Sequence, residues 1–253
     1  MGDSVTPTGA ASLYSTDLAY IHDAGFSTFA RRAAPELIRI LRRLGIRTGL
    51  VVDVGCGGAP LAEPLLHAGY DVLGIDVSPA MIRLARTRAP KARFRVGSLT
   101  TAAIPRCAAV VALNEIVNYV PRGRSGVTAL DGFFARAYKS LRPGGVLIFD
   151  FIASAEDRTY SGKSRAGDDW AVVARAAFDR ASRVLTREIT TFRKIGREYR
   201  KSHETHRISI YGTDEIQNAL RRLGFRVTMR RSYGGLRLVA GDFAVVAEKP
   251  RSA

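Results

Sequence analysis

The stretch VVDVGCGGAP, residues 51–60, decides the fold. Its apolar first half is typical of a buried strand, and its glycine-rich second half is typical of a tight turn that leads into a helix. Glycine has no side chain, so such a turn lets the backbone approach a ligand closely. The ligand of a glycine turn can be a phosphate, a dinucleotide or a molecule without phosphate, and the choice depends on the surrounding sequence.

Strands and helices alternate around this stretch. Continuous apolar runs predict strands at 49–55, 70–78, 92–99, 107–115 and 144–152, and helical spacing predicts helices at 59–69, 78–89 and 126–141. Upstream, we expect disorder at 1–12, short helices at 13–34, and a further helix that Pro35 opens and Gly45 ends. Fully apolar strands between helices indicate a parallel sheet that is covered on both faces.

The alternation stops after residue 152. Residues 153–168 are polar and predict a loop, and three strand-like segments follow at 170–178, 183–194 and 197–211. We interpret them as an antiparallel insertion. A helix with Thr213 as its N-cap and Gly224 as its stop comes next, and FRVTMRRSY and GDFAVVAEKP predict two closing strands.

Size and composition indicate one globular domain. The chain has 253 residues, 46% of them hydrophobic, and a mean hydropathy of −0.02. Within it we expect N-terminal lid helices at 1–45, a cofactor-binding core at 49–152, the insertion at 153–212 as acceptor pocket or dimer contact, and a C-terminal helix with two strands at 213–250.

The cysteine count and the lack of a long apolar run indicate where in the cell the protein works. Two cysteines are too few for a disulfide framework, and no His/Cys cluster has zinc-ligand spacing, so no metal is expected. No apolar run approaches the roughly 20 residues of a membrane helix, and the N-terminus has no secretory pattern. These features predict a cytoplasmic protein without a membrane partner.

The chain is strongly basic, with a net charge of +16. Such a charge fits a polyanionic partner. The basic residues, mostly arginine, are spread along the whole chain, however, and pairs such as Arg31-Arg32 suit the solvated edges of helices. We therefore do not expect nucleic acid to be the substrate.

Three further stretches define what the glycine turn binds. Asp76 ends the second predicted strand, where a carboxylate can accept both hydroxyls of a ribose. Asn114 and Glu115 end the fourth strand, beside the point where the strand order reverses and ligands bind. The turn LRPGG precedes the fifth strand. Together, VVDVGCGG, GIDVS and LRPGGVLIFD resemble the motifs of the class I S-adenosylmethionine-dependent methyltransferase family.

The resemblance covers residues 49–151, and the last helix and two strands extend it to 250. It implies an α/β fold, a doubly wound, seven-stranded, mostly parallel sheet whose last strand is antiparallel, with S-adenosyl-L-methionine as methyl donor. The methionine end would lie along Gly55 and Gly57, Asp53 would hold the turn, and Asp76 would bind the ribose. The full set of cofactor-binding residues expected is Tyr14, Asp53, Gly55, Cys56, Gly57, Asp76, Val77, Met81, Ser98, Leu99, Asn114 and Glu115.

Some of these residues have a second interpretation. Met81, with Val77, would sandwich the adenine, but a methionine on a helix also fits simple core packing. Cys56 is expected to be a small buried residue and not a nucleophile. The sequence departs from the family pattern at Ala59, in place of a third glycine, and at Ser98, where an acidic residue often reads the adenine amino group. Backbone groups at Ser98 and Leu99 are an alternative contact.

Residues 13–26 are the first candidate for the acceptor pocket. They resemble the tyrosine-rich N-terminal segment of small-molecule methyltransferases such as the amino-sugar N-methyltransferases and the glycine/sarcosine-type enzymes. By that resemblance, Tyr14 and Tyr20 would cover the cofactor and His22 or Asp23 would face the acceptor. The alternative is that the tyrosines only pack the lid.

The segment EYRKSHETHRISIY, residues 198–211, is the second candidate. On a strand, Arg200, Glu204 and His206 share one face, because side chains alternate. Our hypothesis is that His206 is the general base or acceptor anchor and that Glu204 supports it; a charged, solvated edge strand is the alternative. Trp170 and Tyr211 flank the insertion. They could form an aromatic wall beside the acceptor, a dimer contact or part of the core.

The leading functional hypothesis is a methyltransferase for a small-molecule acceptor, with specialised metabolism as one setting and nitrogen, oxygen or carbon as the methylated atom. An RNA or protein methyltransferase is the alternative, although LNEIVNY lacks the Asn/Asp-Pro-Pro-aromatic signature used on planar amino groups. A regulator that binds S-adenosylmethionine without catalysis is the alternative of another class. A dehydrogenase is a remote third, because the LRPGG turn has no role in one. A homodimer is a further expectation.

Overall fold

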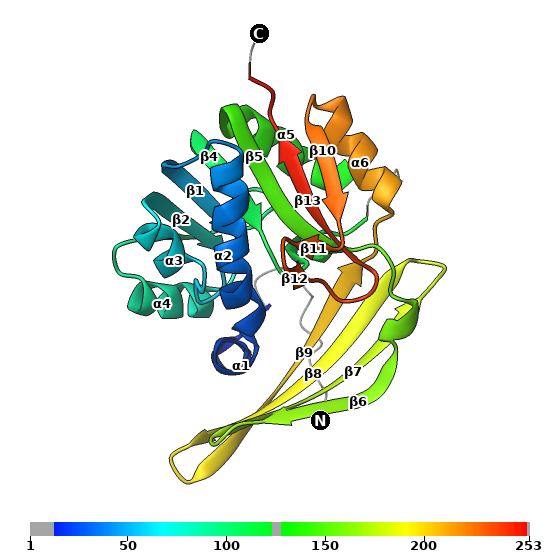
Figure 1. Ribbon diagram of the computed structural model, residues 1–253. Coiled ribbons are helices and arrows are strands. Elements are labelled where there is room, and N and C mark those ends of the chain that lie inside the picture. Colours follow the sequence, from blue (N-terminus) through cyan, green and yellow to red (C-terminus); the bar gives the residue numbers. More distant parts are fainter. Residues whose placement is uncertain (1–12, 123–127, 252–253) are drawn as a thin grey trace.

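The computed structural model describes residues 13–122 and 128–251. Its centre is a seven-stranded sheet in the order β10-β13-β5-β4-β1-β2-β3, shown in Figure 1. The strands are β1 (Gly49–Val54), β2 (Tyr70–Asp76), β3 (Arg93–Val96), β4 (Cys107–Ala112), β5 (Leu141–Ile152), β10 (Arg226–Arg230) and β13 (Asp242–Glu248).

Strand direction follows the predicted pattern. Five neighbouring strands are parallel, in the spatial order β3-β2-β1-β4-β5, and β13 runs antiparallel to both β5 and β10. Val51 to Asp53 pair with β2 on one side and β4 on the other, and all three residues are buried. The predicted doubly wound, mostly parallel fold with an antiparallel last strand is confirmed.

Helices cover both faces of this sheet. Alanines and leucines of α2 (Thr28–Arg43), α3 (Ala62–His67) and α4 (Pro79–Arg88) form one core with the sheet face that carries Val51. Aromatic and aliphatic residues of α5 (Thr128–Ser140) and α6 (Thr213–Arg222) form a second core with the face that carries Val52. Alternate residues of β1 therefore belong to different cores, which explains why Leu50, Val51, Val52 and Val54 are all apolar.

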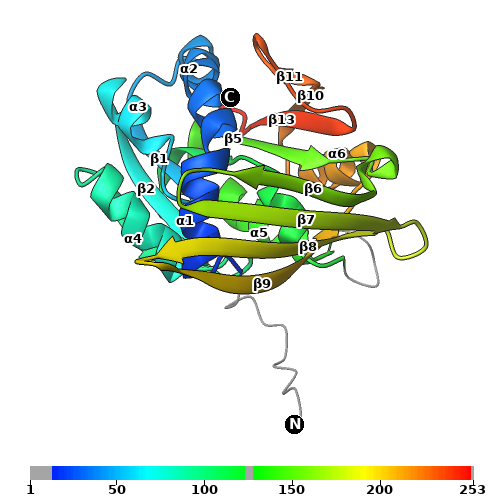
Figure 2. The same cartoon turned by 90° about the horizontal axis from the view of Figure 1, so that it is seen from below.

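A second, antiparallel sheet forms the insertion. It contains β6 (Tyr160–Ala166), β7 (Trp170–Asp179), β8 (Val184–Ile195) and β9 (Glu198–Ser209) in that order. These strands lie below the main sheet in Figure 1, and Figure 2 shows them side by side. The three predicted strands are confirmed, but the loop predicted at 153–168 is wrong over β6. Most side chains of β6 are exposed, so the strand has no apolar face, and only its backbone pairing with β7 defines it.

Helix α1 (Thr16–Phe26) lies between the two sheets, where it contacts α4 on one side and β7 and β8 on the other. The separate helix predicted to open at Pro35 is wrong, because α2 begins at Thr28 and runs through the proline. Ala33, Ala34 and Leu37 around it are fully buried. This packing compensates for the hydrogen bond that a proline removes. The disorder predicted at 1–12 lies outside the described residues.

The C-terminal part differs from the prediction in two details. The N-cap of α6 is Gly212 and not Thr213, and the Gly212 N–H donates to the Glu215 side chain at 2.5 Å. The strand predicted over FRVTMRRSY divides into β10 and a short hairpin of β11 (Ser232–Tyr233) and β12 (Leu236–Arg237). In the part of the chain that the structure describes, no helix has both the length and the apolar character needed to cross a membrane.

Candidate active site

The glycine turn after β1 is held by strand β2. The N–H groups of Gly55 and Cys56 donate to the Ile75 carbonyl at 2.7 and 3.1 Å, and the Gly57 N–H donates to Asp76 Oδ2 at 2.8 Å. Gly55 and Gly57 have φ of 75° and 52°, which side chains disfavour. A Cβ on Gly57 would meet only Met81 Sδ, at 3.8 Å, so the room beside this glycine is open to a ligand.

We call the space beside this turn the turn cavity. It lies at the carboxyl ends of β1, β2 and β4, and Asp53, Gly55, Cys56, Gly57, Asp76, Met81 and Asn114 are among its lining residues. Burial and the neighbouring Asp76 raise the pKa of Asp53 to about 7, and burial raises the pKa of Asp76 despite its hydrogen bonds from Ser78 and Gly57. A cation bound beside these two buried carboxyl groups would stabilise their ionised forms. The turn cavity therefore favours a positively charged ligand.

A larger cavity of about 600 Å³, which we call the inter-sheet cleft, lies between the main sheet and the insertion. Its lining combines apolar side chains from α1, β7 and β8, such as Leu18, Val172 and Ile189, with polar groups from both sheets. Tyr14, His22 and Asn114 line both the inter-sheet cleft and the turn cavity. The two spaces therefore meet at these three residues.

Asn114 and Glu115 have an unusual backbone. Their φ angles are 64° and 55°, so two successive residues without glycine adopt the left-handed conformation. Their N–H groups donate to the two carboxylate oxygens of Asp150 at 3.1 and 2.5 Å, and the Tyr233 hydroxyl donates to the same carboxyl at 3.1 Å. Burial raises the pKa of Asp150 to about 7 although these hydrogen bonds oppose it. Asp150 thus fixes the turn that separates the two cavities.

The floor of the inter-sheet cleft is an ion-pair network. Glu115 bonds to Arg187 at 2.5 Å and to Arg158 at 3.4 Å, and Arg158 also pairs with Asp242 at 2.5 Å. Burial lowers the pKa of Arg187, but the charge and hydrogen bond of Glu115, together with the nearby Tyr119 and Tyr14, raise it above its ordinary value. The network joins the ends of β4 and β13 to the insertion strand β8.

His206 lies at the other wall of the inter-sheet cleft and is buried. Its Nε2 is 3.0 Å from Glu204 Oε2, and its Nδ1 is 3.3 Å from the Tyr119 hydroxyl. Burial would raise the pKa of Glu204, but hydrogen bonds from His206 and Ser15 lower it below its usual range. An ionised carboxylate only accepts, so Nε2 carries a hydrogen, and in the neutral imidazole Nδ1 is then the nitrogen with the lone pair.

Glu204 also fastens the N-terminal segment to the insertion. Its carboxylate accepts the N–H groups of Tyr14 and Ser15, both at 2.8 Å. The Ser78 hydroxyl donates to the Tyr14 carbonyl at 2.7 Å, and the Tyr14 hydroxyl lies 3.4 Å from that of Tyr119. Tyr14 is therefore held from the core and from the insertion at once, over the junction of the two cavities.

The structure brings most of the predicted site residues together. Those that line one or both cavities are Tyr14, His22, Asp23, Asp53, Gly55, Cys56, Gly57, Asp76, Met81, Asn114, Glu115 and His206. The shared face of Arg200, Glu204 and His206 is also present, but Glu204 and His206 point into the protein and do not form the solvated edge that was the alternative.

Other predicted residues lie away from both linings. Arg200 pairs with Asp17 of α1 at 2.5 Å, and the Tyr20 hydroxyl donates to Asp169 at 2.8 Å. Trp170 packs with Ile21 under α1, and Tyr211 lies in the core with its hydroxyl on the Val120 carbonyl at 2.7 Å. Val77, Ser98 and Leu99 lie near the end of β2 and after β3, outside both linings.

Sequence reasoning missed Tyr119, Asp150 and Arg187. Asp150 stands in the quoted LRPGGVLIFD motif, and its place at the end of an apolar strand was a usable signal. Tyr119 and Arg187 reach the inter-sheet cleft only because the insertion folds back on the sheet. Their local sequence therefore gave no signal.

Comparisons with known proteins agree with this architecture. Residues 52–149 match the family described as Methyltransferase domain. A ubiquinone biosynthesis O-methyltransferase of Sinorhizobium fredii is 32% identical over 137 residues, which are 52% of this chain and 49% of that protein. The chain thus spans about half the length of the curated relatives it matches.

Solved structures match over most of the chain. An S-adenosylmethionine-dependent methyltransferase from Clostridium acetobutylicum has a TM-score of 0.77 at 16% identity, with 92% of this chain and 97% of that chain covered. A sugar N-methyltransferase from Streptoalloteichus has a TM-score of 0.74 at 19% identity, covering 100% and 98%. An amino pentose methyltransferase of Micromonospora echinaspora has a TM-score of 0.70 at 22% identity, with 91% of this chain and 95% of that chain covered. At these identities the likeness establishes the fold.

Proposed function

Since the chain belongs to the class I S-adenosylmethionine-dependent methyltransferases, we propose that it transfers a methyl group from S-adenosylmethionine to a small-molecule acceptor. The observation that carries the proposal is the junction of the turn cavity with the inter-sheet cleft at Tyr14, His22 and Asn114. A donor in the first and an acceptor in the second would meet there, and alignment of the two is the main task of such an enzyme.

The turn cavity suits this donor by charge and by the open side of its glycine turn. S-adenosylmethionine carries an ammonium and a sulfonium, and the buried carboxylates of Asp53 and Asp76 favour a cation. The open side of Gly57 leaves room for the methionine end. Asp76 is the residue for the ribose, while its two oxygens also hold the N–H groups of Gly57 and Ser78. Donor binding and turn geometry thus depend on the same carboxylate.

The N-terminal segment would have to move when the donor enters. The turn cavity has a volume of only about 60 Å³, and ligand pockets usually have at least about 300 Å³. Tyr14 and His22 form its outer wall, and the hydrogen bonds from Ser78 and to Glu204 hold Tyr14 in place. We infer that this segment opens for the donor and closes over it.

His206 is the proposed general base. When bound, the donor supplies a methyl group to an in-line nucleophile, and a base is needed only if the acceptor carries a proton at attack. Glu204 holds a proton on Nε2, so in the neutral imidazole Nδ1 receives the acceptor proton, either directly or through the Tyr119 hydroxyl 3.3 Å away. Burial raises the pKa of Tyr119, which keeps this hydroxyl protonated.

His22 is the alternative base, because it lines both cavities. Burial lowers its pKa to about 4, so it is neutral near pH 7. Replacing each histidine separately distinguishes them. His206→Ala should lower turnover by at least about 100-fold, the usual contribution of a general base. His203→Ala is the matched control on the same strand, since His203 is exposed on the opposite face.

The acceptor is best identified by a screen that counts released S-adenosylhomocysteine. The curated relatives are named as ubiquinone biosynthesis O-methyltransferases, and two structural neighbours as sugar N-methyltransferase and amino pentose methyltransferase. We therefore propose phenols and amino sugars as the first two panels. Turnover with a member of either panel supports the proposal. Binding of S-adenosylmethionine without turnover on any small molecule would instead favour the S-adenosylmethionine-sensing regulator.

Turnover on RNA or protein alone would instead favour an RNA or protein methyltransferase.

The homodimer and the cytoplasmic location stay predictions. Light scattering of the purified chain tests whether it forms a homodimer.

A further inference from the structure

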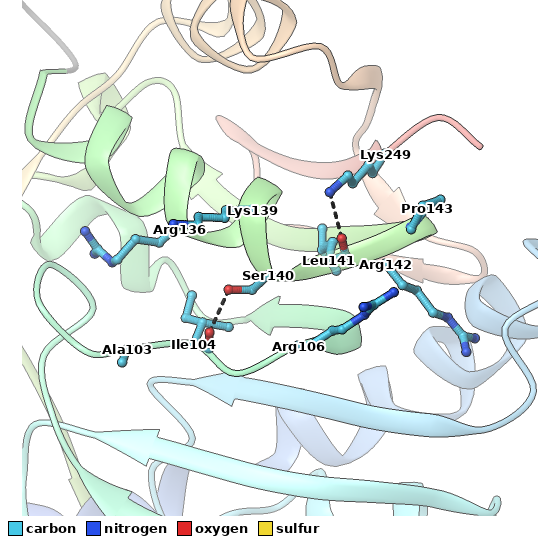
Figure 3. A pocket seen from close by; sticks show the side chains of 10 residues that line it. All are labelled: Ala103, Ile104, Arg106, Arg136, Lys139, Ser140, Leu141, Arg142, Pro143 and Lys249. Atoms are coloured by element: carbon cyan, nitrogen blue, oxygen red, sulfur yellow. Dashed lines mark hydrogen bonds between the residues drawn. The ribbon is translucent and has the colours of Figure 1, made fainter. Parts of the chain in front are cut away.

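A third cavity, of about 570 Å³, lies at the edge of the main sheet opposite the proposed active site. It is formed by the loop before β4, the end of α5, the start of β5 and the residue after β13 (Figure 3). We call it the basic cavity, because half of its ten lining residues are cationic and none is acidic: Arg106, Arg136, Lys139, Arg142 and Lys249.

Three of these cations donate hydrogen bonds to backbone carbonyls, Arg142 through Nη2 to that of Thr48 at 3.4 Å. Lys249 Nζ donates to the carbonyls of Tyr138 and Leu141, both at 2.8 Å, which belong to the end of α5 and the start of β5. Arg136 Nη2 donates to the Leu99 carbonyl at 2.7 Å, while its buried Nε has no partner among the described residues. Carbonyl oxygens fix the positions of these side chains but leave their net charge uncompensated.

A second basic cavity adjoins the first and shares Lys249 with it. Its lining adds Arg43, Arg226 and Arg251 and contains a single carboxylate, Glu248. Within residues 13–122 and 128–251, no ion pair involves any of the eight cations of the two cavities.

Two arginines at the floor of the inter-sheet cleft behave differently. Arg158 and Arg187 there are both paired with carboxylates. At the other edge of the sheet, by contrast, eight cations line two adjoining cavities that contain one carboxylate between them. Like charges gathered without counter-charges create a positive potential that attracts anions.

We propose that the two adjoining cavities form a binding site for a compact anion with several phosphate groups, such as an oligophosphate. Arginine and lysine are the usual phosphate ligands, and two linked cavities fit more than one phosphate. No aromatic side chain is among the lining residues of either cavity, so a nucleobase would have no ring to stack on. The phosphate groups are therefore the part that the site recognises.

Calorimetric titration of the full chain with tripolyphosphate tests the proposal. Arg106→Ala/Lys139→Ala removes two exposed cations of the basic cavity whose side chains make no hydrogen bond to any residue that the structure describes. We expect it to weaken binding at least about tenfold, since hydrogen bonds to charged groups contribute 1.5 kcal/mol or more each. Arg43→Ala/Arg226→Ala should weaken it similarly through the adjoining cavity.

The matched control is Arg31→Ala/Arg32→Ala, which removes two exposed charges from α2 outside both cavities. It should change binding less than about twofold, because distant surface charges are screened. Equal losses in all three double variants would overturn the proposal, as would no binding at all. So would tight binding of a single-stranded oligonucleotide that tripolyphosphate fails to displace, which would assign the surface to nucleic acid. The test does not depend on methyltransferase activity.

Discussion

Replacing Glu204 by glutamine should damage catalysis more than donor binding. The Glu204 carboxylate accepts three hydrogen bonds, from Tyr14 N, Ser15 N and His206 Nε2, at 2.8, 2.8 and 3.0 Å. Glutamine has the same shape, but one of its two terminal atoms is a donor. In one orientation its NH₂ faces Ser15 N–H, and in the other it faces Tyr14 N–H and Nε2 of His206.

The second orientation reverses the histidine tautomer. Nε2 would then accept, Nδ1 would carry the hydrogen, and no lone pair would face Tyr119 and the inter-sheet cleft. A general base contributes about 10²–10⁴-fold to a rate, so we expect kcat to fall at least about 100-fold. The weaker hold on Tyr14 should raise the KM for the donor by about tenfold, the effect of losing about 1.4 kcal/mol from one charged hydrogen bond.

Steady-state release of S-adenosylhomocysteine with the identified acceptor separates these two effects. Glu188→Gln is the matched control, because Glu188 is on the neighbouring strand, pairs with Arg175 and lies opposite Thr205 on the other face of the sheet. Thermal unfolding shows whether each variant is folded. A folded Glu204→Gln protein whose kcat stays within about twofold of the native value would refute the role of His206 as a tuned base.

Three further changes test other parts of the site. Donor affinity should fall by up to about tenfold per pH unit below about pH 7, because Asp53 then takes up a proton and no longer attracts a cation. Asp53→Asn should remove this pH dependence when binding is measured by calorimetry. Asp150→Ala frees the left-handed turn at Asn114 and should raise the KM for donor and acceptor together, since Asn114 lines both cavities. Asn118→Ala leaves backbone groups of Ile152 and Ser209 without partners and should cost about 3 kcal/mol or more in urea unfolding.

The local sequence was sufficient to predict the glycine turn and the shared face of β9, because each depends on residues close together in the chain. Asp53, Gly55, Gly57 and Asp76 follow directly from apolar strands that end in a glycine turn or a carboxylate, and the structure places all four in one cavity. The alternation of residues along β9 likewise put Glu204 and His206 on one face.

The misses arise where tertiary contacts decide. Strand β6 has mostly exposed side chains and is defined by its pairing with β7, and Pro35 stays within α2 because the helix face around it is buried. Tyr119 and Arg187 join the site through the packing of the insertion on the main sheet. The acceptor contacts of Trp170 and Tyr211 stay a prediction that rests on aromatic character, and the packing of both residues fits the alternative of a core role.

The central claim is that the turn cavity binds S-adenosylmethionine through Asp76. Calorimetric titration of the native chain with S-adenosylmethionine tests it most directly, with Asp76→Asn as the variant and Asp71→Asn, at the exposed start of the same strand, as control. We predict one donor per native chain, displaced by S-adenosylhomocysteine, binding at least about tenfold weaker to Asp76→Asn, and no change for Asp71→Asn. No binding to the native chain, or equal binding to all three proteins, would contradict the account.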